Sequence, residues 1–289
     1  MRVLITGAHG QVGRALLAAA PAHVEIVAMG RAELDIGMAD AVADAVRQHR
    51  PDVIINAAAY TAVDRAESEP EIARVVNELG PKHLADAARE TGARLIHVST
   101  DFVFDGRSSL AYAPDAAPNP LNVYGATKLA GERAVQAVLP ERSVVLRTAW
   151  VYTAEGRNFV RTMLRLMQNE RTVRVVTDQI GTPTAAHSVA QVLWRLAESP
   201  ALRGIYHWTD AGVASWYDFA VAIAEEGAAL GLVSEAVEVL PISTEEFPTP
   251  ARRPRFSVLD KRATASATGM TPCHWRRNLR RVLREMRHA

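Results

Sequence analysis

The sequence predicts an α/β protein with a doubly wound parallel sheet and a smaller C-terminal lobe. Short apolar runs alternate with helical patterns through the first half of the chain. The runs are apolar at successive positions, which indicates strands buried on both faces, as in parallel sheets covered by helices on both sides. Right-handed crossovers then limit the topology. Ligands of such sheets bind beyond the carboxyl ends of the strands.

Strands and helices alternate in the first half of the chain. Each expected strand is an apolar run bounded by glycine or polar residues: "RVLITG" (2–7), "VEIVAMG" (24–30), "DVIINAA" (52–58), "RLIHVST" (94–100) and "SVVLRTAWVY" (143–152). Helical patterns cover 11–20, 38–49, 69–90, with Gly80-Pro81 as a candidate break, and the segment that opens around Tyr124.

The second half follows a less regular pattern. Helices are expected at 158–169, 185–198, 216–229 and 275–287, and strands at 172–178, 204–210 and 237–243. Ser215 precedes an acid by three residues, which predicts a capping box at the third of these helices. The proline-rich segment 247–256 predicts an extended loop.

The bulk properties exclude several classes of protein. The chain has 289 residues, 48% of them hydrophobic, a formal net charge of +1 and one cysteine, Cys273. A disulfide framework is therefore excluded, and no global field attracts nucleic acid or an anionic membrane. No apolar run approaches the ~20 residues of a membrane span, and the first residues lack a secretory signal. We expect a soluble, cytoplasmic protein.

A glycine loop follows the first strand. "ITGAHGQVGRAL" places Gly7, Gly10 and Gly13 between that strand and the first helix. Such glycines allow a tight turn and close approach of a pyrophosphate to the helix N-terminus. A flexible turn is the alternative for a lone glycine motif. In this context the loop predicts a Rossmann-type dinucleotide-binding domain over residues 1–150. Residues 151–289 are then a mixed segment that completes the sheet and forms the substrate lobe.

The end of the second strand bears on the choice of dinucleotide. An acid there would bind the adenine ribose hydroxyls and select NAD. Gly30-Arg31 occupy the position instead, and the nearest acids are Glu33 and Asp35. Arg31 is either a partner for a 2′-phosphate or a solvated loop residue. We expect NADPH as the cofactor, with NADH also used.

"NVYGATKLAGE" (122–132) places Tyr124 and Lys128 four residues apart, on one face of a helix. A packed tyrosine beside a solvated lysine is the simplest interpretation of the spacing alone. However, only three of the 33 basic residues are lysines: Lys82, Lys128 and Lys261. Because the chain otherwise uses mostly arginine, a lysine beside Tyr124 is a weak indication that this position has a specific role.

The order of these motifs resembles the extended short-chain dehydrogenase/reductase superfamily: the glycine loop, "NAAA" after the third strand, "ST" after the fourth, then Y-x-x-x-K. The resemblance implies that Tyr124 gives a proton to a ketone while nicotinamide gives a hydride. The Lys128 ammonium would lower the phenol pKa from about 10 and hold the nicotinamide ribose. Thr100 would polarise the substrate oxygen.

Narrower motifs resemble the dTDP-4-dehydrorhamnose reductase family over essentially the whole chain, above all "STDFVFDG", "DQIGTPT" and "PTPARRP". This resemblance implies NAD(P)H-dependent reduction of the 4-keto group of dTDP-4-dehydro-6-deoxy-L-mannose to dTDP-L-rhamnose. It places Gly10, Gln11 and Val12 at the cofactor phosphates and Asp35 and Ile36 near the adenine. It also places Ala58, Ala59 and Tyr60 on the path to the nicotinamide, and Thr100, Asp101 and Trp150 at the sugar.

One family feature is missing from this chain. Some members are dimers bridged by Mg²⁺ through glutamates, one of them just after the glycine loop, where this chain has Arg14 and Ala15. We therefore expect no bound metal, and either a monomer or a homodimer without a magnesium bridge. The basic C-terminal helix has an apolar stripe. It is expected to dock on the body, with its arginines in solvent rather than on nucleic acid or a membrane.

Two alternatives remain open from the sequence. A nucleotide-sugar epimerase or dehydratase of the same superfamily would keep NAD bound throughout its cycle. Relatives of the fold also serve as non-catalytic regulatory subunits of methionine adenosyltransferase. The presence of Thr100, Tyr124 and Lys128 together argues against a role without catalysis.

Overall fold

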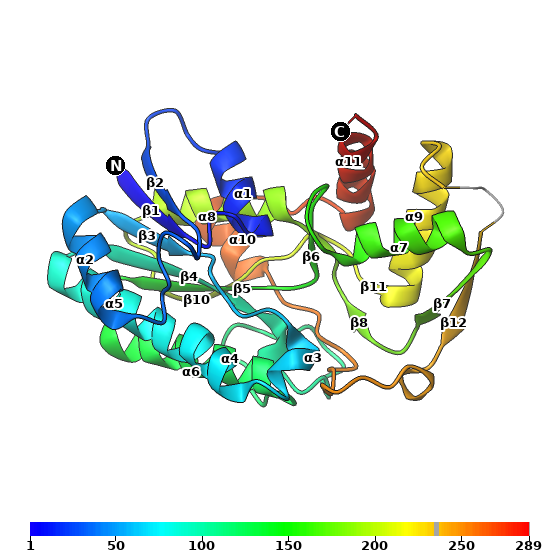
Figure 1. Cartoon of the computed structure of the whole chain (residues 1–289), viewed down its shortest axis with the longest axis horizontal. Coiled ribbons are helices and arrows are strands. Elements are labelled where there is room, and N and C mark those ends of the chain that lie inside the picture. Colours follow the sequence, from blue (N-terminus) through cyan, green and yellow to red (C-terminus); the bar gives the residue numbers. More distant parts are fainter. Residues whose placement is uncertain (234–236, 289) are drawn as a thin grey trace.

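The computed structural model describes residues 1–233 and 237–288. Its centre is a six-stranded parallel sheet, and a smaller lobe stands beside it (Figure 1). In order across the sheet, the strands are β2 (Glu25–Met29), β1 (Arg2–Thr6), β3 (Val53–Asn56), β4 (Arg94–Thr100), β5 (Ser143–Thr148) and β10 (Gly204–His207). The chain leaves β1 on one side for β2 and returns on the other side for β3. The switch point, where such sheets bind ligands, therefore lies between β1 and β3. The predicted doubly wound parallel sheet is confirmed.

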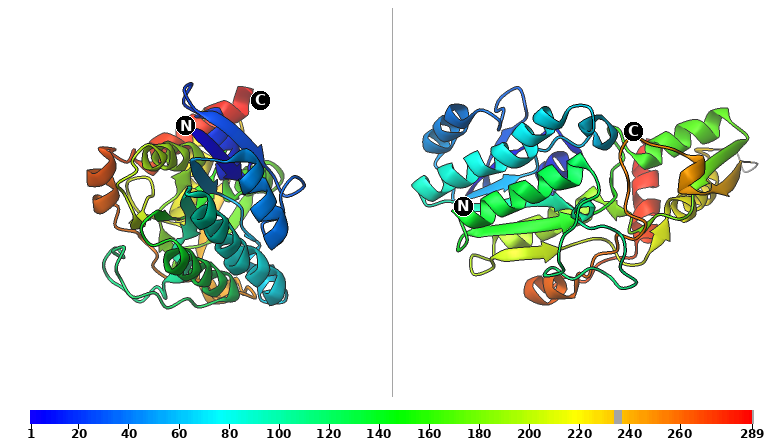
Figure 2. Two further views of the ribbon diagram at one scale, coloured as in Figure 1. Left: turned by 90° about the vertical axis from the view of Figure 1, so that its left-hand side faces the viewer. Right: turned by 90° about the horizontal axis from the view of Figure 1, so that it is seen from below.

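Helices cover both faces of the sheet (Figure 2). One layer contains α2 (Ala39–His49), α5 (Gly80–Thr91) and α6 (Val123–Val138). The other contains α1 (Gln11–Ala18), α8 (Ala186–Ala197) and α10 (Arg262–Thr268). Since α8, α10 and β10 come from the second half of the chain, that half completes both the sheet and its helical cover. Among the described residues, no helix has both the length and the apolar character to cross a membrane.

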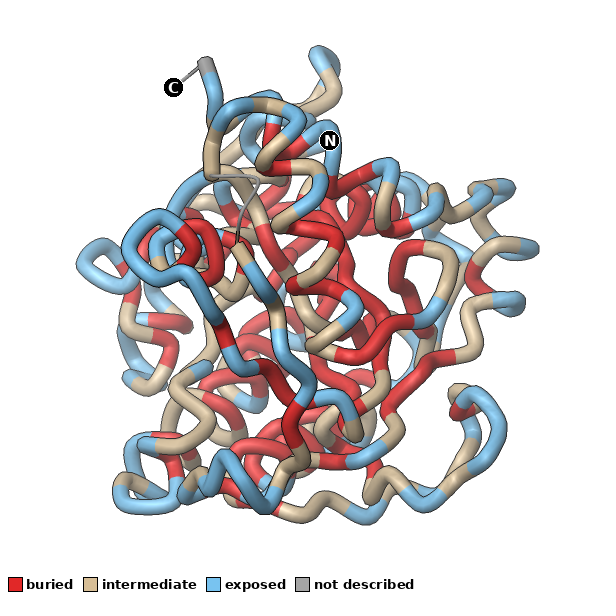
Figure 3. Tube along the Cα trace, turned by 90° about the vertical axis from the view of Figure 1, so that its right-hand side faces the viewer, coloured by how far each residue is buried: buried red, intermediate tan, exposed pale blue. Residues whose placement is uncertain are grey.

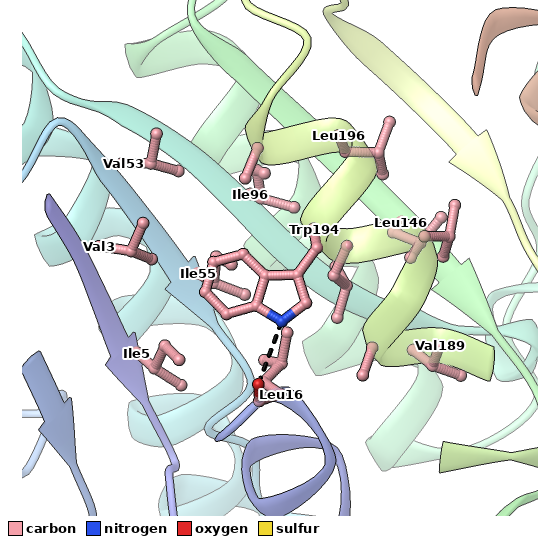
Figure 4. Packing of buried hydrophobic residues seen from close by; sticks show 14 of the residues in the cluster. Val3, Ile5, Leu16, Val53, Ile55, Ile96, Leu146, Val189, Trp194 and Leu196 are labelled. Atoms are coloured by element: carbon pink, nitrogen blue, oxygen red, sulfur yellow. Dashed lines mark hydrogen bonds between the residues drawn. The ribbon is translucent and has the colours of Figure 1, made fainter. Parts of the chain in front are cut away.

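Alternation along the strands explains the two cores. Val3 and Ile5 of β1 face the α1/α8 layer, while Leu4 faces the opposite layer. The indole of Trp194 on α8 lies across the first of these faces and donates a hydrogen bond of 3.0 Å to the Leu16 carbonyl (Figure 4). This hydrogen bond satisfies the indole N–H, the one polar group of this large buried side chain.

The second lobe has a core of its own. Figure 3 views the molecule from the side of this lobe, with buried segments of the chain in red. It contains α7 (Phe159–Asn169), α9 (Trp216–Ala229), α11 (Trp275–His288), and the parallel pair β7 (Thr172–Val176) and β12 (Glu238–Ile242). The capping box of Ser215 and Asp218 at the start of α9 is confirmed. The apolar stripe of α11 is buried as predicted.

The polar face of α11 is not wholly solvated. Arg276 pairs with Glu225 and Glu226 of α9, and Arg280 pairs with Glu226 at 2.8 Å. Part of the basic face that the sequence assigned to solvent therefore holds two helices of the lobe together.

The expected strand 143–152 is wrong as a single element. β5 ends at Thr148, and Trp150 has a φ of +49°, which turns the chain. β6 (Val151–Tyr152) then pairs with β9 (Thr184–Ala185) outside the central sheet. Short strands β8 (Ile180–Gly181) and β11 (Ala214–Ser215) also pair with each other there. The turn moves the chain from the sheet into the lobe.

The long helical pattern at 69–90 has no break at Gly80-Pro81. α3 (Val63–Ala66) precedes it, and α4 (Pro70–Arg74) continues through a π-helix (Val75–Leu79) into α5. Gly80 keeps helical dihedral angles, with φ −55° and ψ −52°. Proline fits at the next position because the irregular π-turn lies just before it. Two 3₁₀ turns, Asp101–Val103 and Thr244–Glu246, complete the elements.

Candidate active site

Two connected hollows lie at the carboxyl ends of the central strands. The smaller, of about 250 Å³, runs from the glycine loop to Arg31, Asp35 and Ile36. The larger, of about 550 Å³, contains Thr100, Tyr124 and Lys128. Both are lined by Gly10, Ala57 and Ala59. Every site residue named from the sequence lines one hollow or the other. These residues are Gly7, Gly10, Gln11, Val12, Arg31, Asp35, Ile36, Ala58, Ala59, Tyr60, Thr100, Asp101, Tyr124, Lys128 and Trp150.

The glycine loop has the shape that a dinucleotide phosphate requires. Gly7 has a φ of +68°, and a Cβ there would lie 2.5 Å from the Ala58 nitrogen. A Cβ on Gly13 would lie 2.3 Å from the Gly7 carbonyl oxygen. Helix α1 begins at Gln11 with no side-chain cap and no acid in its first turn. Its first N–H groups and its positive dipole end are therefore free to meet an anion.

Beyond β2 the hollow is edged by charged side chains. The Arg31 side chain is 78% exposed, and its Nε lies 3.7 Å from Asp35 Oδ2. Glu33 instead accepts a hydrogen bond of 2.8 Å from the Gly30 N–H. Arg31 thus lies at the edge of the hollow, in a solvent-exposed ion pair with Asp35.

Asn77 organises the loop that carries Ala59 and Tyr60, and sequence reasoning missed it. This buried residue of the π-helix accepts a hydrogen bond of 2.9 Å from the Tyr60 N–H and donates one of 3.1 Å to the Tyr60 carbonyl. It also donates to Thr127 Oγ1 of α6 at 3.3 Å. The one available signal was an asparagine in the apolar run "ARVVNELG". Its inward direction depends on the π-turn, which the helical pattern did not indicate.

Tyr124 lies at the floor of the larger hollow. Phe102 packs edge-on against its ring, with 5.6 Å between ring centroids. Burial raises the pKa of Tyr124 to about 12, a hydrogen bond with Thr100 lowers it, and the nearby Asp101 raises it. The sequence had predicted a pKa below the ordinary value. Loss of hydration at the buried phenol outweighs the lowering effect of Thr100, so the direction is the opposite.

Asp101 is a buried carboxyl beside the phenol. Thr100 Oγ1 donates to its Oδ1 at 3.1 Å, while Oδ2 has no partner among the described residues. Burial raises the pKa of Asp101 to about 6, against the lowering effect of hydrogen bonds from Ser257 and Thr100. An unpaired buried acceptor at a cavity wall is suited to bind a hydroxyl of a ligand.

Lys128 is buried below the same surface. Its Nζ donates to the Val98 carbonyl at 2.7 Å and lies 3.3 Å from His97 Nε2. Burial lowers the pKa of Lys128 to about 8, whereas the negative charge of Glu132 raises it. The Lys128 ammonium therefore loses its proton more readily than that of a solvent-exposed lysine.

The lobe supplies the opposite wall. The ring of Trp150 stacks on Trp216, with centroids 3.5 Å apart and planes 5° from parallel. Arg157 and Arg253 line the same hollow, and Arg253 is anchored by Asp64 at 2.8 Å. Of these residues only Trp150 was singled out from the sequence, although Arg253 belongs to the quoted segment "PTPARRP". No group of three histidine, cysteine or acidic side chains in the described part of the chain has the arrangement to hold a metal.

The fold and the site define an extended short-chain dehydrogenase/reductase. The defining features are the Rossmann-type sheet, the glycine loop at its switch point, and the Tyr–Lys pair beside a threonine at a strand end. The family profile described as "RmlD substrate binding domain" matches residues 1–288. The chain is 43% identical over 288 residues to the dTDP-4-dehydrorhamnose reductase of Aggregatibacter actinomycetemcomitans, covering 97% of this chain and 98% of that protein. It is 45% identical over 281 residues to the Streptomyces griseus enzyme of the same name, with 95% and 90% covered.

Solved structures agree with the sequence relatives. The dTDP-4-dehydrorhamnose reductase of Bacillus anthracis, in complex with NADP, superposes with a TM-score of 0.92 at 37% identity, covering 98% of this chain and 99% of that one. The chain therefore belongs to the dTDP-4-dehydrorhamnose reductase family.

Proposed function

We propose that the protein uses NADPH to reduce the 4-keto group of dTDP-4-dehydro-6-deoxy-L-mannose, giving dTDP-L-rhamnose. The observation that carries the proposal is the meeting of Thr100, Tyr124 and Lys128 in one hollow that continues into the glycine-loop groove. The names of the relatives and the NADP complex of the Bacillus anthracis enzyme support both the substrate class and the cofactor.

The cofactor would lie along the two hollows. Its phosphates would meet the free N–H groups of Gln11 and Val12, and its adenine would lie near Asp35 and Ile36. Arg31, which lines the same hollow, would meet a 2′-phosphate. When bound, the nicotinamide supplies the hydride. The close packing of Gly7 and Gly13 supports this fit, because a side chain at Gly7 would collide with the backbone of Ala58 and one at Gly13 with the glycine loop.

Tyr124 would supply the proton. A raised pKa keeps the phenol protonated at neutral pH, which is the form that a proton donor needs. Thr100 holds the phenol by a hydrogen bond and would share the developing alkoxide with it. Lys128 would bind the nicotinamide ribose and stabilise the phenolate that remains after the transfer.

The sugar nucleotide would enter between the sheet and the lobe. Asp101 presents an unpaired oxygen for a sugar hydroxyl. Trp150 offers an aromatic face to the sugar, and Arg157 and Arg253 offer two cations to the diphosphate. Arg14 and Ala15 after the glycine loop support a monomer or homodimer without a magnesium bridge, and the composition supports a cytoplasmic enzyme.

Turnover with a panel of substrates tests the proposal. Purified protein is supplied with NADPH and the 4-keto-6-deoxy sugar on dTDP, UDP or GDP, and NADPH consumption is followed. We expect consumption with the dTDP compound and much less with the others. Isolation of the protein with tightly bound NAD, and no NADPH consumption, would instead favour an epimerase or dehydratase.

A further inference from the structure

A chain of buried polar side chains runs beneath the candidate active site. Thr6, Asn56 and His97 are cross-strand neighbours on β1, β3 and β4, and His97 reaches Lys128 on α6. All four side chains are buried, with at most 1% of their surface exposed. The proposed reaction uses Lys128 but gives no role to His97.

Hydrogen bonds fix the orientation of Asn56. Its Oδ1 accepts from the backbone N–H of Ala58 at 3.0 Å and from Thr6 Oγ1 at 2.8 Å. A backbone N–H can only donate, so the atom facing it is the amide oxygen. The amide nitrogen therefore faces His97 Nδ1, at 3.0 Å. Because an amide nitrogen donates, His97 Nδ1 must be the acceptor and carries no proton.

The remaining ring nitrogen then has a defined state. Burial, together with Lys128, holds the pKa of His97 well below its usual range, so the ring is neutral. A neutral imidazole without a proton on Nδ1 carries it on Nε2. That N–H lies 3.3 Å from Lys128 Nζ. An ammonium has donors only and opposes this N–H, whereas a neutral amine accepts it through its lone pair.

We propose that His97 is a positioning residue that acts through Lys128: its Nε2–H favours the neutral amine of Lys128 over the ammonium. The importance of this effect for turnover rests on the proposed function, but the protonation pattern itself does not. Lys128 then gains and loses a proton near neutral pH and is available to exchange it with the phenol of Tyr124. The Val98 carbonyl accepts from Nζ in either state.

Burial by itself lowers the pKa of Lys128, and the other charged groups around Nζ do not add to this effect. Glu132, one helical turn further along α6, raises the pKa of Lys128. Arg147 of β5 pairs with Glu132 at 2.7 Å and offsets much of its charge. Tyr124, on the same helix, is uncharged at neutral pH. His97 is the titratable side chain of β4 that lies against Nζ.

Nuclear magnetic resonance tests the proposal without any assay of activity. The chain has only three lysines, so the Lys128 ¹³Cε signal is identified by comparison with Lys82→Arg and Lys261→Arg variants. In the wild type we expect Lys128 to titrate with a pKa of about 8. The ¹⁵N shifts of His97 should show the proton on Nε2. A proton on Nδ1 would overturn the proposal, even if no variant folds.

His97→Phe keeps a buried ring and removes both nitrogens. We expect it to raise the pKa of Lys128 by roughly one unit, because the amine loses its donor. If His97 instead accepted from the ammonium, the same change would lower that pKa. His207→Phe is the matched control, since this buried histidine of β10 contacts Arg147 and the Tyr112 carbonyl; the Lys128 pKa should not change in it. A lowered or unchanged value in His97→Phe would overturn the proposal. A protein that passes these tests but lacks reductase activity would refute the proposed function alone.

Discussion

Tyr124 shows how burial and chemistry act together on one residue. Its phenol is almost wholly buried, and burial keeps it protonated, although the hydrogen bond with Thr100 lowers its pKa. Tyr124→Phe keeps the ring and its packing against Phe102, so binding should be largely unaffected. Loss of the proton donor should lower kcat by about 10²–10⁴-fold, the usual contribution of general acid catalysis. Steady-state kinetics, with NADPH affinity measured by fluorescence, checks both parts. A variant with near-normal turnover would remove Tyr124 from the mechanism.

Arg31 is the residue on which the choice of cofactor depends. Because its side chain is 78% exposed, its attraction for a 2′-phosphate should have the size of a surface ion pair. Arg31→Ala should therefore raise KM for NADPH by roughly two- to fivefold and leave KM for NADH unchanged. An unchanged ratio of kcat/KM between the two cofactors would show a solvated loop residue. Asp35→Ala, which removes the partner of Arg31, is the matched comparison.

The raised pKa of Asp101 makes the free energy of unfolding depend on pH. The folded protein holds the Asp101 proton up to about pH 6, whereas the ordinary pKa is 3.8. The folded state thus binds more protons, and the free energy of unfolding should fall as the pH rises from about 4 to 6. Asp101→Asn should raise this free energy at pH 7 by roughly 1–3 kcal/mol and have little effect at pH 4, while substrate affinity falls.

Urea unfolding at the two pH values measures the effect of Asp101→Asn. Asp105→Asn is the control, because the Arg107 N–H holds the pKa of Asp105 below its usual range and this substitution should not stabilise the protein. An equal gain from Asp101→Asn at both pH values would contradict the account.

At the scale of elements, a buried ion pair joins α6 to the sheet. Arg147 of β5 donates from Nε and Nη2 to the Glu132 carboxylate, which also accepts from Ser99 of β4. Removing one partner leaves a buried charge uncompensated. Glu132→Gln should therefore lower the free energy of unfolding by about 3–5 kcal/mol. The exposed pair Lys82–Asp86 gives the control: Asp86→Asn should cost under about 1 kcal/mol. Similar losses from the two substitutions would show that burial does not govern this pair.

Most of the helices and strands could be predicted from the sequence, but the turn into the lobe could not. The strands of residues 2–100 and the glycine loop follow from local apolar runs and spacing, so their positions were predicted to within a few residues. The turn at Trp150 depends on the pairing of β6 with β9, about thirty residues later, and no local pattern reports it. Asn77 supports the Tyr60 loop because of the π-turn, and Trp216 reaches the larger hollow because of the placement of the lobe. Spacing located Tyr124 and Lys128, but burial decided the direction of the phenol pKa.

At the scale of the molecule, the site is built from both halves of the chain. The sheet and α6 bring Thr100, Tyr124 and Lys128 together, and the lobe adds Trp216 to the same hollow. The proposed division of labour is that the sheet carries the reacting groups while the lobe selects the sugar nucleotide. In this proposal a hydride from NADPH reaches the 4-keto carbon on this surface.

Transfer of an isotope from the cofactor tests the proposed hydride transfer. The protein is incubated with the dTDP-4-keto-6-deoxy sugar and NADPH that carries deuterium at the transferable position of the nicotinamide, and the product is analysed by mass spectrometry and NMR. We expect dTDP-L-rhamnose with one deuterium, located at C4 of the sugar. A product without deuterium, or a sugar that is epimerised or dehydrated while NADPH is not consumed, would contradict it.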